Sequence, residues 1–83
     1  MARRSMARER RALAVTVREL RARKRLTQEQ VAELAGRSRN FVAEVEGGRR
    51  GSSFEGIIAI VQALEVPVEE FGRVFDSRLA ETP

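Results

Sequence analysis

The feature that most constrains this chain is a pair of short helical segments, each bounded by clear start and stop signals, between residues 27 and 48. Thr27 is expected to begin the first segment, because a threonine followed three residues later by Gln30 forms a capping-box pattern. Gly36 is expected to end it in the left-handed conformation that glycine tolerates. Ser38 is the expected cap of the second segment, which runs until a glycine pair ends it. The turn between the segments is therefore very short and holds them at a steep angle.

The remainder of the chain also has helical patterning, because alternation of β-branched residues is scarce and apolar residues recur at spacings of three and four. Ser5 is the expected cap of the first helix, and Ser52 or Ser53 that of the fourth. The expected helices cover residues 6–24, 27–35, 39–46, 53–64 and 68–75. Val31, Leu34 and Ala35 are expected to form the buried side of the second helix. The residues expected to be buried together are Leu20, Val31, Leu34, Val42, Val45, Ile58, Val61 and Leu64. The sequence thus predicts an all-α domain of five helices over residues 6–75, preceded by a basic arm (1–5) and followed by a tail (76–83).

Composition narrows the chemistry available to the chain. Its 83 residues contain no cysteine and no histidine, which removes disulfides, thiolate or imidazole metal sites, and Cys or His catalysis. We find no catalytic triad, paired-carboxylate cleft or Gly-rich phosphate loop, so we expect no enzymatic activity and no cofactor. No apolar run approaches the roughly 18 residues of a membrane span. We therefore expect a cytoplasmic protein.

The net charge of +4 is distributed unevenly along the chain. Residues 1–25 hold ten basic and two acidic residues (+8), residues 26–53 four of each (0), and residues 54–83 two basic and six acidic residues (−4). A basic surface suits a polyanion, because bound arginine and lysine release the condensed counterions of nucleic acid. A solvated, arginine-rich helix is the plainer interpretation of the same charge pattern.

Two short helices joined by a tight turn are typical of helix-turn-helix proteins, in which the second helix enters the major groove. The stretch LTQEQVAELAGRSRNFVAEVEGGRR, residues 26–50, resembles the lambda-repressor-like (Xre-type) helix-turn-helix family, and the resemblance extends over residues 17–71. The matching family positions are Gln28, Val31, Ala32, Gly36, Glu46, Gly48, Ala63 and Leu64. The resemblance implies a five-helix fold and a transcriptional regulator that binds double-stranded DNA. Within the family, Arg39-Asn40-Phe41 and Gly48-Arg49-Arg50 are most similar to controller proteins of restriction–modification systems.

The chain departs from the family pattern at three positions. Gly47 stands where the family usually has a polar residue, so a contact to the DNA backbone is expected to be missing there. Ser52 replaces a common proline. Glu65 stands where the family favours glycine, and a left-handed conformation costs a non-glycine residue roughly 1 kcal/mol or more. The turn after the fourth helix is therefore expected to differ.

The chemistry of the side chains assigns roles at the expected interface. Arginine suits guanine and asparagine suits adenine, while alanine can touch a thymine methyl and glutamate can accept from cytosine. The predicted base contacts are Arg39, Asn40, Ala43 and Glu44; the predicted phosphate contacts are Gln28, Ser38, Arg49 and Arg50. Glu44 has the alternative of orienting Arg39 or Arg37. Phe41 has two alternatives, which are packing on the turn and lying against sugars and thymine methyls. The arm residues Arg3 and Arg4 are further candidates for a groove contact.

Two structural roles complete the expectations. The family resemblance implies a partly buried ion pair between Arg21 and Glu46. An apolar stripe near the acidic end predicts a two-fold dimer interface formed by Phe71, Val74, Phe75 and Leu79. The expected partners are double-stranded DNA and a second copy of the chain, with RNA polymerase as a further candidate. A controller protein, a phage-type repressor, an autoregulating antitoxin and a protein-interaction module that retains the fold without binding DNA all remain open.

Overall fold

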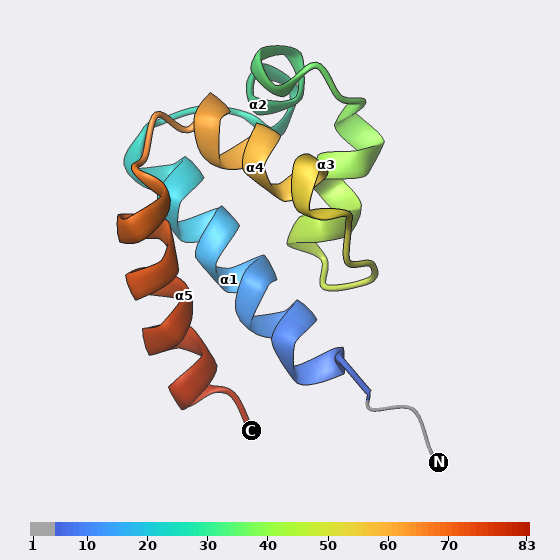
Figure 1. Cartoon of the computed structure of the whole chain (residues 1–83). Coiled ribbons are helices and arrows are strands. Elements are labelled where there is room, and N and C mark those ends of the chain that lie inside the picture. Colours follow the sequence, from blue (N-terminus) through green and yellow to red (C-terminus); the bar gives the residue numbers. More distant parts are fainter. Residues whose placement is uncertain (1–4) are drawn as a thin grey trace.

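The computed structural model describes residues 5–83, and these residues form five α-helices and no strand (Figure 1). The helices are α1 (Ala7–Arg23), α2 (Gln28–Ala35), α3 (Arg39–Glu46), α4 (Phe54–Ala63) and α5 (Val68–Glu81). The arm residues Arg3 and Arg4 lie outside the described part of the chain. The predicted all-α, five-helix class is confirmed. None of the described helices is long and apolar enough to cross a membrane.

Local capping explains where the middle helices begin. The hydroxyls of Ser38 and Ser53 accept hydrogen bonds from the backbone N–H groups of Phe41 and Gly56, at 3.1 and 3.2 Å. Each bond satisfies a donor that a helix start leaves without a partner. The first helix differs from the expectation: its N-cap is Met6, which makes no side-chain capping bond, and Ser5 accepts only from the N–H of Ala7.

The core is an aliphatic cluster to which every helix contributes. Its fully buried members include Val17, Leu20, Val31, Val42, Val45, Ile60, Val61 and Leu64. Two predicted core residues do not belong to it. Leu34 is 63 % exposed, and Ile58 is only half-buried. In α2 the buried positions are Val31 and Ala32, and Ala35 packs against the cluster. The face of α2 that contacts the core is therefore the one that carries these three residues, and Leu34 lies beside it.

Helix α5 is longer than predicted and lies along α1 (Figure 1). It ends at Glu81 rather than at Phe75, so most of the expected tail is helical. The guanidinium of Arg8 explains part of this extension, because it donates to the backbone oxygens of Leu79 and Thr82 at 2.8 and 2.9 Å. These bonds satisfy carbonyl groups that a helix end leaves free and place positive charge at its negative pole. The start of α1 and the end of α5 are thereby joined.

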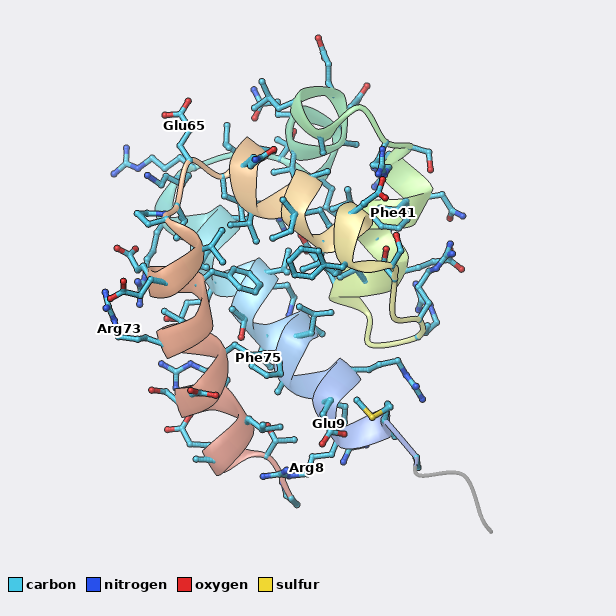
Figure 2. All side chains as sticks on the ribbon, in the orientation of Figure 1. Arg8, Glu9, Phe41, Glu65, Arg73 and Phe75 are labelled. Carbon is cyan, nitrogen blue, oxygen red and sulfur yellow. The ribbon has the colours of Figure 1, made fainter. Side chains whose placement is uncertain are left out.

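The turns that follow α1 and α4 both contain a non-glycine residue in the left-handed region. Arg25 has φ 57° and Glu65 has φ 55°. The turn after α4 therefore keeps the left-handed geometry, although the sequence suggested that a glutamate there would change it. The side chain of Glu65 points away from the molecule (Figure 2), which avoids further crowding at the strained backbone.

Candidate nucleic-acid interface

The arrangement of α2 and α3 is fixed by bonds at both ends of α2. The Thr27 hydroxyl accepts from the N–H of Gln30 at 3.0 Å, and the Gln30 side chain accepts from the N–H of Thr27 at 2.8 Å. Gly36 ends α2 with φ 66°, and Ser38 begins α3 two residues later. The predicted capping box and left-handed glycine are thus confirmed. The three-residue connection leaves α3 at the edge of the molecule, where one of its faces is open (Figure 1).

Helix α3 has one apolar face and one polar face. Val42 and Val45 have no exposed surface and hold the helix on the core. The predicted base-contacting residues share the outward side: Arg39 and Asn40 are exposed, and Ala43 and Glu44 are half-buried. These positions lie at i, i+1, i+4 and i+5, which one face of a helix brings together. The polar face therefore combines a guanidinium, an amide, a methyl group and a carboxylate within two turns.

An ion pair beneath this surface ties α1 to α3. The Arg21 guanidinium donates to both carboxylate oxygens of Glu46, at 2.6 and 2.8 Å, and to the backbone oxygen of Leu26 at 2.9 Å. Glu46 is only 3 % exposed. The hydrogen bond to Glu46 raises the pKa of Arg21, burial lowers it, and the charge of Glu46 adds to the increase. The stability from the raised pKa is present below the ordinary arginine pKa and is lost only as the pH rises through the raised value.

Gln28 joins the same network. Its amide nitrogen donates to Glu46 at 3.1 Å, so this predicted phosphate contact also bridges α2 to α3. The amide nitrogen carries two N–H groups, and the second remains for another acceptor. Ser38, another predicted phosphate contact, is exposed, but its hydroxyl already accepts the capping bond from Phe41.

Glu44 has a different partner from those that the sequence suggested. Its carboxylate accepts from Arg50 at 3.2 Å and from the amide of Asn40 at 3.4 Å, whereas Arg39 and Arg37 were the expected partners. The Arg50 guanidinium also lies 5.4 Å from the centre of the Phe41 ring, within cation–π range. Arg50 therefore connects the loop after α3 to the polar face of that helix.

Phe41 packs inside the molecule rather than projecting from α3 (Figure 2). It is half-buried against the core, and a Cβ placed on Gly56 would lie 3.0 Å from its ring and 2.1 Å from the Ser52 hydroxyl. The absence of a side chain at position 56 therefore allows α4 to approach the ring closely. Of the two expectations for Phe41, packing within the domain describes its position in this structure.

The predicted dimer residues lie along α5 with different exposures. Phe71 is 8 % exposed and belongs to the core, and Val74 packs against the same cluster. Phe75 is half-buried and lines an open cavity of about 450 Å³ together with Leu13 and Ile57. Leu79 is half-buried near the end of the helix. Only part of the expected stripe is thus available to another molecule.

The sequence interpretation missed two arginines of α1. Arg11 and Arg18 line a groove that also contains Glu46, Gly47 and Gly48, at the end of α3. Their spacing of seven residues is two helical turns and places them on one face of α1. That spacing is visible in the sequence, but nothing in the sequence shows that this face lies beside the end of α3.

Comparison with known proteins defines the class of protein. A family model described as a helix-turn-helix domain matches residues 12–74, so the chain belongs to the helix-turn-helix family. The resemblance to its lambda-repressor-like, Xre-type members is confirmed by the solved structures described below. The chain has the fold of a DNA-binding transcriptional regulator. No significant match is found among curated protein sequences.

Two groups of solved structures are similar to this chain. The restriction-modification controller protein C.AhdI from Aeromonas hydrophila is 32 % identical, with a TM-score of 0.76 over 82 % of this chain and 99 % of that chain. The clp gene regulator ClgR from Corynebacterium glutamicum is 29 % identical, with a TM-score of 0.81 over 87 % of this chain and 77 % of that chain. The controller protein C.Esp1396I shares the fold, with a TM-score of 0.83 at 19 % identity over 87 % of this chain and 95 % of that chain.

Proposed function

We propose that this protein is a sequence-specific regulator of transcription that binds double-stranded DNA as a homodimer at an inverted-repeat operator. The observation that carries the proposal is the polar face of α3, where exposed Arg39 and Asn40 stand on a helix anchored by Val42 and Val45. An α-helix fits the major groove, and these side chains match the hydrogen-bonding edges of guanine and adenine. Arg39, Asn40, Ala43 and Glu44 read bases in this proposal.

The phosphate contacts come from the residues around α3. Arg49 and Arg50 are exposed in the loop that follows it, and Gln28 and Ser38 lie at the starts of α2 and α3. The free N–H groups at a helix start attract anions, so a phosphate can lie across each of these termini. Because Glu44 holds Arg50, this pair also sets the position of the loop relative to the bases.

We infer that the regulator is a restriction–modification controller protein. The similarity to C.AhdI supports this role, because it reaches 32 % identity over nearly the whole of that chain. C.Esp1396I, whose fold this chain shares, was solved as a tetramer in complex with its natural 35 base-pair operator. A regulator of chromosomal genes is the second candidate, supported by the 29 % identity to ClgR.

Selection of bound sites from random duplex DNA tests the function. We expect an inverted repeat with half-sites about 10 bp apart, centre to centre, or a multiple of that distance.

Arg39→Ala should weaken binding by about 1–3 kcal/mol and relax the preference at one base pair. Arg50→Ala should weaken selected and unrelated sites alike. Arg73→Ala, on the far side of α5, is the control for lost charge. Failure to enrich any sequence would contradict the function and favour a protein-interaction module that retains the fold without binding DNA.

A further inference from the structure

A groove between α1 and the end of α3 lies next to the proposed recognition face. It has a volume of about 260 Å³ and is lined by Arg11, Arg18, Glu46, Gly47 and Gly48, among others. Gly48 has φ 69°, and a Cβ placed on it would lie 3.8 Å from the backbone of α1. The loop therefore passes close to α1, and the two glycines line the groove together with Ala14 and Val15 of that helix.

The arginines of the groove form no ion pair with another of the described residues. Arg11 and Arg18 are both exposed. Within residues 5–83, the side chain of Arg18 has no hydrogen bond or ion pair, and that of Arg11 donates one bond, to the backbone oxygen of Pro83 at 2.9 Å. The acidic residue of the groove, Glu46, is already bound by Arg21 and by Gln28. The exposed Arg18 guanidinium is therefore without a partner among the described residues, and Arg11, which lines the same groove, has only its bond to Pro83.

The groove is continuous with the polar face of α3. Gly47 follows the last residue of α3 and lies four positions after Ala43, on the side that faces outward. A Cβ placed on Gly47 would lie 3.1 Å from the Arg49 guanidinium carbon, so Arg49 stands at the rim of the groove. A polyanion that crosses the end of α3 would pass between the arginines of the loop and those of α1.

We propose that Arg11 and Arg18 form a second binding site for the phosphates of the DNA duplex, in the groove beside Gly47 and Gly48. The inference rests on the proposed DNA-binding function and extends the interface from α2 and α3 onto α1. The Arg49 guanidinium lies beside Gly47, 3.1 Å from where a Cβ would be, so a phosphate in the groove would meet Arg49 together with the arginines of α1. The site positions the protein and reads no base, because a phosphate carries no sequence information.

The salt dependence of binding tests this site. Titrations of the selected operator and of an unrelated duplex, each at several salt concentrations, give the slope of log affinity against log salt. Each lost phosphate contact should reduce that slope by about 0.9. We expect Arg18→Ala to reduce it by about one ion on both duplexes, and the Arg11→Ala, Arg18→Ala double variant by about two. Base preference, measured on single-base variants of the operator, should be unchanged.

Arg73→Ala is the matched control, because it removes the same charge from an exposed arginine that points away from the body of the molecule (Figure 2). A thermal melt of each variant checks that the fold is kept. If Arg18→Ala behaves as Arg73→Ala does, the groove holds no phosphate and the inference is overturned. A change in base preference would overturn it as well. If the unmodified protein shows no salt-dependent binding to either duplex, the proposed function itself fails. Failure of the groove site can therefore be told apart from failure of DNA binding as a whole.

Ethylation interference locates the contact on the DNA. Ethylation of a phosphate that lies in the groove should block binding of the unmodified protein and should no longer matter for Arg18→Ala. The phosphates held by Arg49 and Arg50 should remain sensitive in both proteins. An identical interference pattern for the two proteins would count against the site.

Discussion

At the scale of single residues, the Arg21–Glu46 ion pair shows how a buried charge holds α3, which carries the proposed recognition face, against α1. The two partners are unequally covered, because the Glu46 side chain is 2 % exposed and that of Arg21 is 23 % exposed. Removing either partner leaves the other without its counter-charge, but only the arginine can turn toward water. The family resemblance suggested this pair, whereas no sequence pattern indicates that α1 and α3 meet at these positions.

This difference in burial predicts unequal effects on stability. Arg21→Ala should lower the free energy of unfolding by about 3–5 kcal/mol, because it leaves a buried carboxylate unpaired. Glu46→Gln should cost less, about 1–3 kcal/mol, because the amide still accepts a hydrogen bond and the guanidinium reaches solvent. Arg73→Ala breaks an exposed pair with Glu69 and should cost less than about 1 kcal/mol. Urea titrations measure all three variants, and equal losses for Arg21→Ala and Glu46→Gln would contradict the argument.

At the scale of elements, the two ends of α2 and the start of α3 were predictable, and the buried face of α2 was less so. Thr27, Gly36 and Ser38 act through bonds to residues at most four positions away, so the local sequence contains the whole signal. The buried face of α2 depends on the direction of its neighbours. Residues 31, 32, 34 and 35 are all apolar, and they cover more of the helix than the core can contact. The packing of α3 and α4 leaves Leu34 outside.

The end of α5 was missed for a similar reason. Residues 76–81 contain polar side chains that suggested a tail, but Arg8 binds the final turn from α1, 71 and 74 residues away in the chain. The same limit applies to the candidate interface. The order of residues in α3 predicts which side chains share its polar face, whereas the pairing of Glu44 with Arg50 and the position of Arg18 beside Gly47 depend on tertiary structure.

The position of Leu34 gives a direct test of the packing of α2. Leu34→Ala should change the free energy of unfolding by no more than about 0.5 kcal/mol, as is usual for exposed positions. Leu64→Ala makes the same chemical change at a residue with no exposed surface and should cost about 2–5 kcal/mol. Thermal or urea unfolding distinguishes them. A large loss for Leu34→Ala would mean that α2 packs with the face that the sequence alone suggested.

At the scale of the whole molecule, basic and acidic surfaces lie on different elements. Charge that attracts DNA is concentrated on α1 and in the loop after α3, whereas residues 54–83 carry a net charge of −4. The acidic part of the chain also contains Phe75, which opens onto the cavity of about 450 Å³. The lining of this cavity is largely apolar, with Leu13 and Ile57 beside Phe75, and an apolar surface suits contact with another protein better than contact with DNA. The proposed dimer therefore forms through α5, with the recognition helices left free.

The exposures along α5 sharpen the test of this dimer. Phe71 supports the core of its own chain, so a charge there would unfold the protein and reveal nothing about association. Phe75 is the better position, because it is half-buried and lines an open cavity. Covering the rest of this half-buried side chain contributes part of the roughly 1.5–3 kcal/mol of a full burial, and a carboxylate there would lose its water, so Phe75→Glu should convert the dimer to a folded monomer. Leu34→Glu makes the same change of charge at an exposed position on α2 and serves as the control.

Sedimentation equilibrium at micromolar concentration measures the outcome. We expect the unmodified protein and Leu34→Glu to be dimers and Phe75→Glu to be a monomer with an unchanged circular dichroism spectrum. On DNA, the monomer should bind a single half-site and the full operator with similar affinity, because the two half-sites of an inverted repeat are joined only through the dimer contact. A monomeric unmodified protein at high concentration would rule out the α5 dimer. A dimer that survives Phe75→Glu would place the two-fold interface on another surface of the molecule.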